Sequence, residues 1–216
     1  RQRCANGYVY PPFYLYPAGT NVYDFSYQMP VEECGNMLIM LESAISFGAS
    51  PKLVESCLSL LAKWVRYLDE FGEDPGEQLC TDDFAGHLNR NINLAAKAIV
   101  GIACYSRMMK RIGRHEEAQK WNDRAHAMAA NWLERARGER NTALTFDGNG
   151  WSMKYNLVWD LVLGLELLPK EFYSAETESY LPLINEFGLP LDSRADYTKS
   201  DWTVWCASMA QDPAVF

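Results

Sequence analysis

Charged and aromatic residues gather in four short segments that lie far apart in the sequence. The segments read PVEECGN, CTDDFAGH, WSMKYN and LDSRADYTKSDW, and each lies beside or just inside the start of an apolar stretch with helical spacing. Carboxylates such as Glu33 and Asp83 can activate a water molecule as general bases. The guanidinium of Arg194 can hold a carboxylate in two-point geometry. Together these residue types predict a site for a small polar substrate.

Helix capping explains some of these residues without any functional role. Asp and Glu are favoured in the first turn of a helix, where they accept backbone N–H groups and oppose the helix dipole. Capping does not account for Lys154, Lys199, Arg194 and His87, because cations are disfavoured at that end of a helix. We therefore interpret the four segments together as parts of one site.

The candidate residues fall into two groups. Those expected to be catalytic are Glu32, Glu33, Asp82, Asp83 and Asp201. Those expected to bind the substrate are Asn36, His87, Lys154, Tyr155, Trp159, Asp160, Asp192, Arg194, Asp196, Tyr197, Lys199 and Trp202. Neither a metal nor another cofactor is expected, because the six cysteines are scattered and lack metal-ligand spacing.

Composition excludes several classes of partner. The chain has 216 residues, a net charge of −8 and no run of basic residues, which argues against nucleic acid binding. No apolar run approaches the ~20 residues that span a bilayer, and no signal peptide is recognisable. The expected partner is a small polar molecule.

Hydrophobic spacing predicts an all-α fold. Residues 1–29 form a lead-in rich in Tyr, Pro and Gly, and a helical domain is expected over residues 30–216. Seven helices are predicted, over residues 30–48, 50–72, 84–112, 114–138, 152–168 and 174–188, with a seventh from Lys199.

The helices are expected to pair as antiparallel hairpins. The first member of each pair is apolar nearly all round, as in AAKAIVGIACY, whereas the second carries a charged stripe. A helix that is apolar on every side is buried, so the first members should form an inner ring and the second members an outer ring. Parallel inner helices would begin at one end of the domain, which would bring the four polar segments around one cavity.

The same segments resemble a known family. MPVEECGNMLIM, QLCTDDFAGHLNRNINLAAKAIVGIA, WSMKYNLVWDLVLGL and GLPLDSRADYTKSDW are similar, in this order, to segments of the glutaminase A family. The resemblance runs from about Met29 to Ala210 and implies an (α/α)6 toroid of six helical hairpins. It also implies a preceding β-rich domain, secretion, and hydrolysis of L-glutamine. Since six hairpins need twelve helices, the toroid is expected to be incomplete here, completed by its missing part, by the β-rich domain or by self-association.

Three functions remain open at this point. The first is attack of water on the side-chain amide of glutamine, with Asp83 or Glu33 as base, Arg194 on the α-carboxylate, and Glu32 or Asp196 on the ammonium group. The second is glycoside hydrolysis with inversion, which needs two carboxyl groups about 6.5–9.5 Å apart. Trp151, Trp159 and Trp202 could then stack on sugar rings. The third is a non-catalytic structural module.

Overall fold

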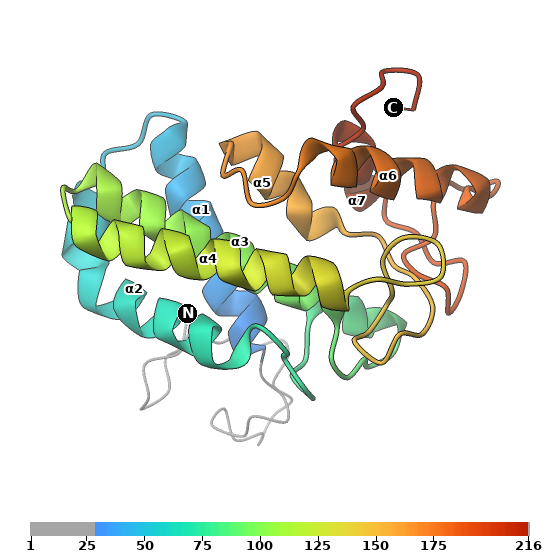
Figure 1. The fold of residues 1–216 in the computed structure, drawn as a ribbon, viewed down its shortest axis with the longest axis horizontal. Coiled ribbons are helices and arrows are strands. Elements are labelled where there is room, and N and C mark those ends of the chain that lie inside the picture. Colours follow the sequence, from blue (N-terminus) through green and yellow to red (C-terminus); the bar gives the residue numbers. More distant parts are fainter. Residues whose placement is uncertain (1–28, 216) are drawn as a thin grey trace, which may run out of the picture.

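The computed structural model describes residues 29–215, and within this range the fold is all-α (Figure 1). Its seven α-helices are α1 (Pro30–Ser46), α2 (Lys52–Phe71), α3 (Ile92–Arg111), α4 (His115–Arg135), α5 (Val158–Leu163), α6 (Lys170–Tyr180) and α7 (Ser200–Ser208). Short 3-10 helices lie at Thr81–Ala85 (η3), Tyr155–Leu157 (η4) and Leu181–Leu183 (η5). The all-α prediction is confirmed, while the predicted lead-in at 1–29 lies outside the described residues except for Met29.

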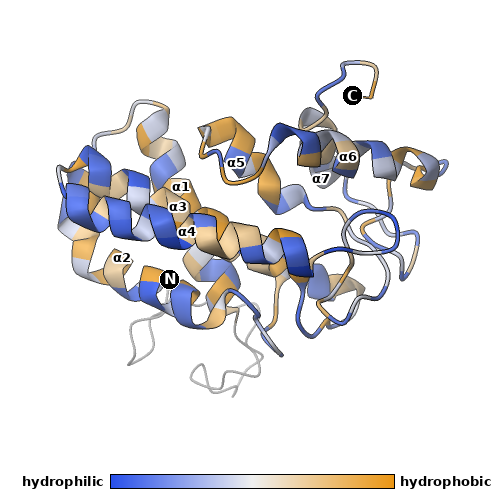
Figure 2. Ribbon diagram, viewed as in Figure 1, coloured by the Kyte–Doolittle hydropathy of each residue, from blue (hydrophilic) through white to orange (hydrophobic). Residues whose placement is uncertain are grey.

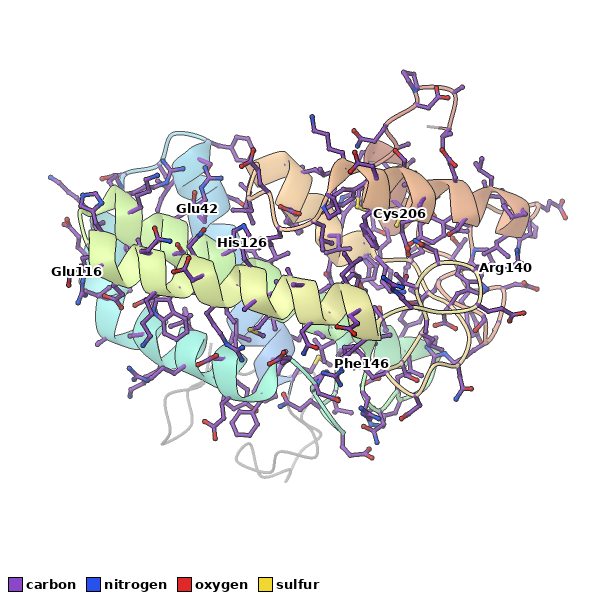
Figure 3. All side chains as sticks on the ribbon, viewed as in Figure 1. Glu42, Glu116, His126, Arg140, Phe146 and Cys206 are labelled. Carbon is purple, nitrogen blue, oxygen red and sulfur yellow. The ribbon has the colours of Figure 1, made fainter. Side chains whose placement is uncertain are left out.

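The inner helices α1, α3 and α5 run in parallel. Lys97 of α3 pairs with Glu32 near the start of α1, and Arg111 near the end of α3 pairs with Glu42 near the end of α1. Figure 3 labels Glu42 on α1. Arg107, one turn before Arg111, donates to the carbonyl of Leu163 at the end of α5. Charged groups therefore tie these helices together at matching heights.

The short helix α7 follows the same direction. Trp202 in its first turn stacks on Tyr155 of η4, and Trp205 one turn later meets Trp159 of α5 edge to face. Four chain segments thus begin at the same end of the domain, as the hairpin pattern predicts.

Helix α3 lies at the centre of the core. Every residue from Ile92 to Ser106 is buried, and α3 packs against α1, α2 and α4. Glycines allow the closest approach, because a Cβ atom added to Gly35 would lie 2.7 Å from the Cγ atom of Lys97. Absence of a side chain at Gly35 therefore sets the distance between α1 and α3.

The outer helix α4 runs back along α3. It carries alternating hydrophilic and hydrophobic stripes (Figure 2), and its buried residues include Trp121, Met128 and Trp132. The indole N–H of Trp132 donates to the carbonyl of Ile92 at 3.0 Å, while Trp121 packs edge to face on Tyr105. These contacts at opposite ends of α3 make the pair an antiparallel hairpin.

Several predicted boundaries are wrong. The helix expected over 174–188 is α6, which begins at Lys170 and ends at Tyr180, before η5. The helix expected from residue 84 begins at Ile92, because Asn91 accepts a hydrogen bond from the backbone N–H of Leu94 and caps α3. Arg90, just before this cap, has a positive φ of 57° that breaks any earlier helix. The helix expected over 152–168 is reduced to η4 and α5, since Gly164 ends it in the left-handed conformation.

Candidate functional site

A pocket of about 430 Å³ lies where the inner helices begin. One face of α1 forms a wall, and η3, α3, η4, α5 and α7 contribute the remainder. The lining residues are Glu32, Asn36, Ile39, Met40, Ser43, Thr81, Lys97, Tyr155, Asn156, Trp159, Trp202 and Trp205. Five of the predicted site residues, Glu32, Asn36, Tyr155, Trp159 and Trp202, therefore share one cavity.

Glu32 forms the acidic part of the pocket. Its side chain is almost fully buried and forms an ion pair with Lys97, whose ammonium group is buried as well. The hydroxyl of Thr81 donates to the same oxygen, Oε1, at 2.7 Å. Both hydrogen bonds from the described residues end on Oε1, which leaves Oε2 available to a ligand or a water molecule.

A second carboxylate, Asp82, lies behind the pocket wall. The hydroxyl of Tyr155 donates to Asp82 Oδ1 at 2.7 Å, and Asn91 Nδ2 donates to Oδ2 at 3.3 Å. Burial raises the pKa of Asp82 above its ordinary value, the negative charge of Glu32 adds to the rise, and the hydrogen bonds from Tyr155 and Asn91 oppose it. Tyr155 is thus the group through which Asp82 can act on a molecule in the pocket.

Tyr155 stays neutral in this setting. Burial and the nearby charges of Asp82 and Glu32 raise the pKa of its hydroxyl well above the ordinary value. The hydroxyl can therefore donate a proton only if Asp82 supplies another.

Asn156 adds a polar group with an unusual environment. Its Nδ2 atom donates to the carbonyl oxygen of Asn93 at 2.9 Å, which orients the amide because a carbonyl oxygen only accepts. Its Oδ1 atom is buried without a hydrogen-bond partner among the described residues, and so is Nδ2 of Asn93. An unpaired buried polar atom is costly and calls for a ligand or a water molecule.

Asp83 and His87 do not line the pocket. The carboxylate of Asp83 accepts from the backbone N–H of Cys80 at 2.9 Å and lies 3.3 Å from the ring of His87. His87 also contacts Glu77, and its side chain is exposed. Asp83 acts as a cap of η3 here, as the capping interpretation predicts.

Arg194 is held away from the pocket. It forms two hydrogen bonds with Asp192, at 2.9 Å from Nε and 2.7 Å from Nη2, and a third with the carbonyl of Gly86. With Asp192 and Asp196 it lines a separate depression of about 410 Å³. Arg194 does not line the candidate pocket, and its planar group is paired with Asp192, so its expected clamp on a substrate carboxylate stays a prediction.

Two further predicted residues are structural. Asp160 is buried and accepts hydrogen bonds from the backbone N–H groups of Leu167 and Leu168 and from the hydroxyl of Tyr173, so it anchors the chain after α5. Lys154 is fully buried, and its ammonium group donates to the carbonyl and hydroxyl oxygens of Ser152. Burial lowers the pKa of Lys154 to about 8, although the charges of Glu176 and Asp82 oppose the shift.

The remaining predicted residues lie around the site without lining the pocket. Glu33 is buried in the first turn of α1, whereas Asp196, Tyr197, Lys199 and Asp201 are exposed. Asp201 is exposed at the start of α7 and does not line the pocket, so its expected catalytic role stays a prediction.

Lys97, Thr81 and Asn156 line the pocket but were not among the named candidates. Thr81 and Asn156 belong to two of the four polar segments, whereas Lys97 stands out as a cation in the mostly apolar stretch INLAAKAIVGIAC. A buried lysine requires a charged partner. The sequence alone could not identify that partner, since Glu32 lies 65 residues away.

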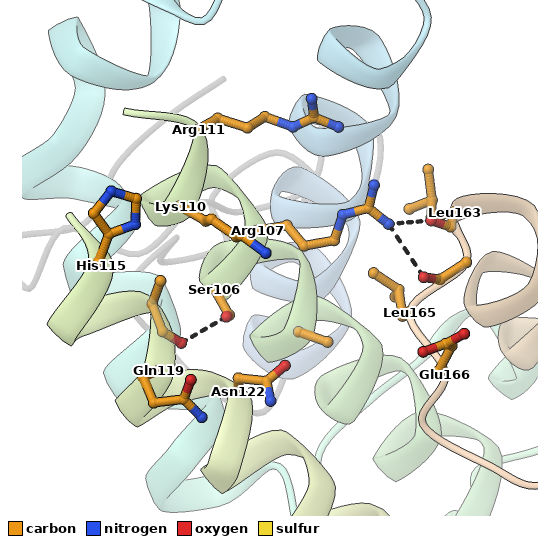
Figure 4. Close-up of a pocket in the computed structure, with 13 residues that line it drawn as sticks. Ser106, Arg107, Lys110, Arg111, His115, Gln119, Asn122, Leu163, Leu165 and Glu166 are labelled. Atoms are coloured by element: carbon orange, nitrogen blue, oxygen red, sulfur yellow. Dashed lines mark hydrogen bonds between the residues drawn. The ribbon is translucent and has the colours of Figure 1, made fainter. Parts of the chain in front are cut away.

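A larger cavity of about 710 Å³ lies at the opposite end of α3 (Figure 4). Arg107, Lys110, Arg111 and His115 line it, but the two arginines already bind Glu42, and Arg107 also binds the carbonyl groups that end α5. These pairs explain the two arginines by helix packing, so we place the candidate site in the smaller pocket.

Within the described range, no cluster of three His, Cys, Asp or Glu side chains could hold a metal ion. Between residues 29 and 215, no helix combines the length and the apolar character that crossing a bilayer requires.

Parallel inner helices, antiparallel outer helices and a polar pocket at the inner helix starts define a domain of the helical-hairpin class. Residues 10–216 match the family described as the glutaminase A six helical-hairpin domain, and the chain belongs to this family. The resemblance in the four polar segments is thereby confirmed.

Two curated relatives are similar to the chain. Glutaminase A of Aspergillus oryzae is 33% identical over 86% of this chain, and a probable glutaminase of Arthroderma benhamiae is 27% identical over 91%. The chain spans 28% and 32% of the length of these two proteins.

Proposed function

We propose that the pocket between α1, α3, α5 and α7 hydrolyses the side-chain amide of L-glutamine. The observation that carries the proposal is the pairing of Glu32 with Lys97 beside the pair of Tyr155 with Asp82. Both relatives are named as glutaminases, which favours glutamine among amide substrates.

The first step needs a base and an electrophile. Glu32 takes a proton from a water molecule through Oε2, and the water oxygen attacks the carbonyl carbon of the substrate amide. The carbonyl bond opens and its electron pair moves to oxygen. The ammonium group of Lys97 has three N–H donors and donates one of them to Glu32. It stabilises this oxyanion with the others.

The second step breaks the carbon–nitrogen bond. The electron pair of the oxyanion re-forms the carbonyl bond as the nitrogen departs. The hydroxyl of Tyr155, which donates to Asp82 in the structure, turns its proton toward this nitrogen and takes another from the carboxyl of Asp82, whose pKa is raised by burial. Ammonia and the carboxylic acid of glutamate leave. The proton held on Glu32 then returns to Asp82 through water, which resets the site.

Ammonia release from the full-length protein tests the proposal. Glu32→Gln and Tyr155→Phe should each lower kcat by about 10²–10⁴-fold, because each removes one acid–base role. Glu134→Gln, on the exposed face of α4, is the matched control and should keep full turnover. Folded wild-type protein that releases no ammonia from glutamine would refute the assignment.

Glycoside hydrolysis is the second candidate. Trp159 and Trp205 line the pocket, and Asp82 has the raised pKa that a general acid needs. Turnover of aryl glycosides, lost in Asp82→Asn, would favour this activity over amide hydrolysis. A folded protein inactive on both substrate classes would instead support the non-catalytic structural role.

A further inference from the structure

A row of aromatic rings leads from the pocket to the protein surface. Tyr155 stacks on Trp202 with ring centres 4.2 Å apart, and Trp202 lies 6.1 Å from Phe84. Phe84 then meets Tyr197 at 6.2 Å. Tyr155 and Trp202 are buried, whereas Phe84 is 49% and Tyr197 57% exposed. The two outer rings therefore present apolar surface directly beside the candidate site.

Lys199 places a cation on the same surface. Its Nζ atom lies 4.5 Å from the ring centre of Phe84 and 5.9 Å from that of Trp202. No carboxylate of the described residues lies within ion-pair distance of this ammonium group, whereas Arg194 is paired with Asp192. Lys199 is thus a cation near the pocket that has no ion-pair partner among the described residues and can bind an anion.

Phe84, Tyr197 and Lys199 form a surface patch, and η3 connects this patch to Glu32. Phe84 follows Thr81 by three residues in this short helix, and the exposed Thr81 lines the pocket and donates to Glu32. A molecule that reaches Glu32 past Thr81 would extend over Phe84 and Tyr197. Exposed aromatic surface beside a polar pocket is typical of a binding site.

We propose that Phe84, Tyr197 and Lys199 form an outer subsite that binds the backbone end of the substrate. The substrate carboxylate pairs with Lys199, and a planar group attached to the glutamine packs on the two rings. Short peptides that end in glutamine after an aromatic residue fit this chemistry best. This inference rests on the proposed function, since the amide of that glutamine must point toward Glu32.

The dipeptides Phe-Gln and Gly-Gln isolate the contribution of the rings, because they share the carboxylate and the amide. We expect wild-type full-length protein to bind Phe-Gln roughly 2- to 13-fold more tightly, the range that one aromatic contact supplies. Calorimetry measures this affinity ratio whether or not turnover occurs, and kcat/KM for ammonia release should show the same preference.

Variants assign the preference to the patch. Tyr197→Ala and Phe84→Leu should bring the affinity ratio toward 1, while Lys199→Gln should weaken both dipeptides. Phe47→Ala is the matched control, because Phe47 is an exposed ring at the far end of α1. Thermal unfolding of each variant verifies that it folds.

Two results would overturn the inference. One is an affinity ratio near 1 in the wild-type protein, and the other is a ratio that persists in both ring variants. A change confined to oligomeric state or stability would make the patch a protein interface instead. Absence of ammonia from every substrate, with the affinity ratio intact, would reject only the proposed amide hydrolysis.

Discussion

At the scale of single residues, the site depends on which charges are buried and which partners they have. Glu32 and Asp82 are buried beside each other, and they differ because Glu32 is paired with Lys97 whereas Asp82 is hydrogen-bonded by neutral groups. Different environments for neighbouring carboxylates are how one site supplies both a base and an acid.

Lys154 allows a test of how burial shifts the pKa of a charged group and thereby the stability of the protein. Its pKa is about 8 in the folded protein and 10.5 ordinarily, so between these values the unfolded chain holds more protons than the folded one. Stability therefore rises with pH through this window, by up to about 3 kcal/mol for this group. We expect wild-type protein to gain this stability relative to Lys154→Met between pH 7 and pH 10.5, measured by urea unfolding.

The exposed Lys63 supplies the control for this experiment. Lys63→Met should follow the wild-type pH profile, because an exposed ammonium group is equally hydrated in both states. If the unfolding free energies of wild type and Lys154→Met changed with pH in parallel, burial would not lower the pKa of Lys154.

At the scale of elements, the position of Lys97 depends on how closely α1 approaches α3. Gly35 leaves room for the stem of Lys97, and Gly101 lies opposite with little space for a side chain. The two glycines therefore set the geometry of the Glu32–Lys97 pair, although neither of them lines the pocket.

Gly35→Ala should destabilise the protein by about 1–3 kcal/mol, because the new Cβ atom collides with the Cγ atom of Lys97. Lys97→Ala removes Cγ as well as the charge. Combining the two substitutions should therefore cost less than the two single effects together, and a double-mutant cycle of unfolding free energies measures this coupling. Strict additivity would show that the contact does not limit the helix spacing.

At the scale of the whole molecule, the helices around the pocket leave apolar side chains exposed. Met40 of α1, Val162 of α5 and Val204 of α7 are each at least half exposed. Exposed apolar groups on several helices around one pocket favour contact with further protein.

This exposure predicts that the chain alone binds an apolar dye. Met40→Gln with Val204→Gln should lower the dye fluorescence without lowering the unfolding temperature, because both side chains contribute more to the surface than to the core. Leu53→Gln, on the half-exposed side of α2, controls for the general loss of one apolar group. Dye fluorescence that stays unchanged in the double variant would place the binding surface elsewhere.

The sequence by itself determined the all-α class and the hairpin pattern. Helical periodicity and the contrast between apolar and striped helices are local properties, so they can be read from neighbouring residues. The position of Tyr155, Trp202 and Glu32 around one pocket followed from parallel inner helices.

Only the tertiary structure decided which polar residues face the pocket. Asp160, Lys154 and Arg194 have the same residue types as functional groups, yet each is paired with local backbone or side-chain partners. Lys97 and Asn156 enter the site through contacts with residues more than 60 positions away. Burial, and the pairing of Lys97 and Asn156, depend on the packing of distant segments, and no local pattern of the sequence contains that information.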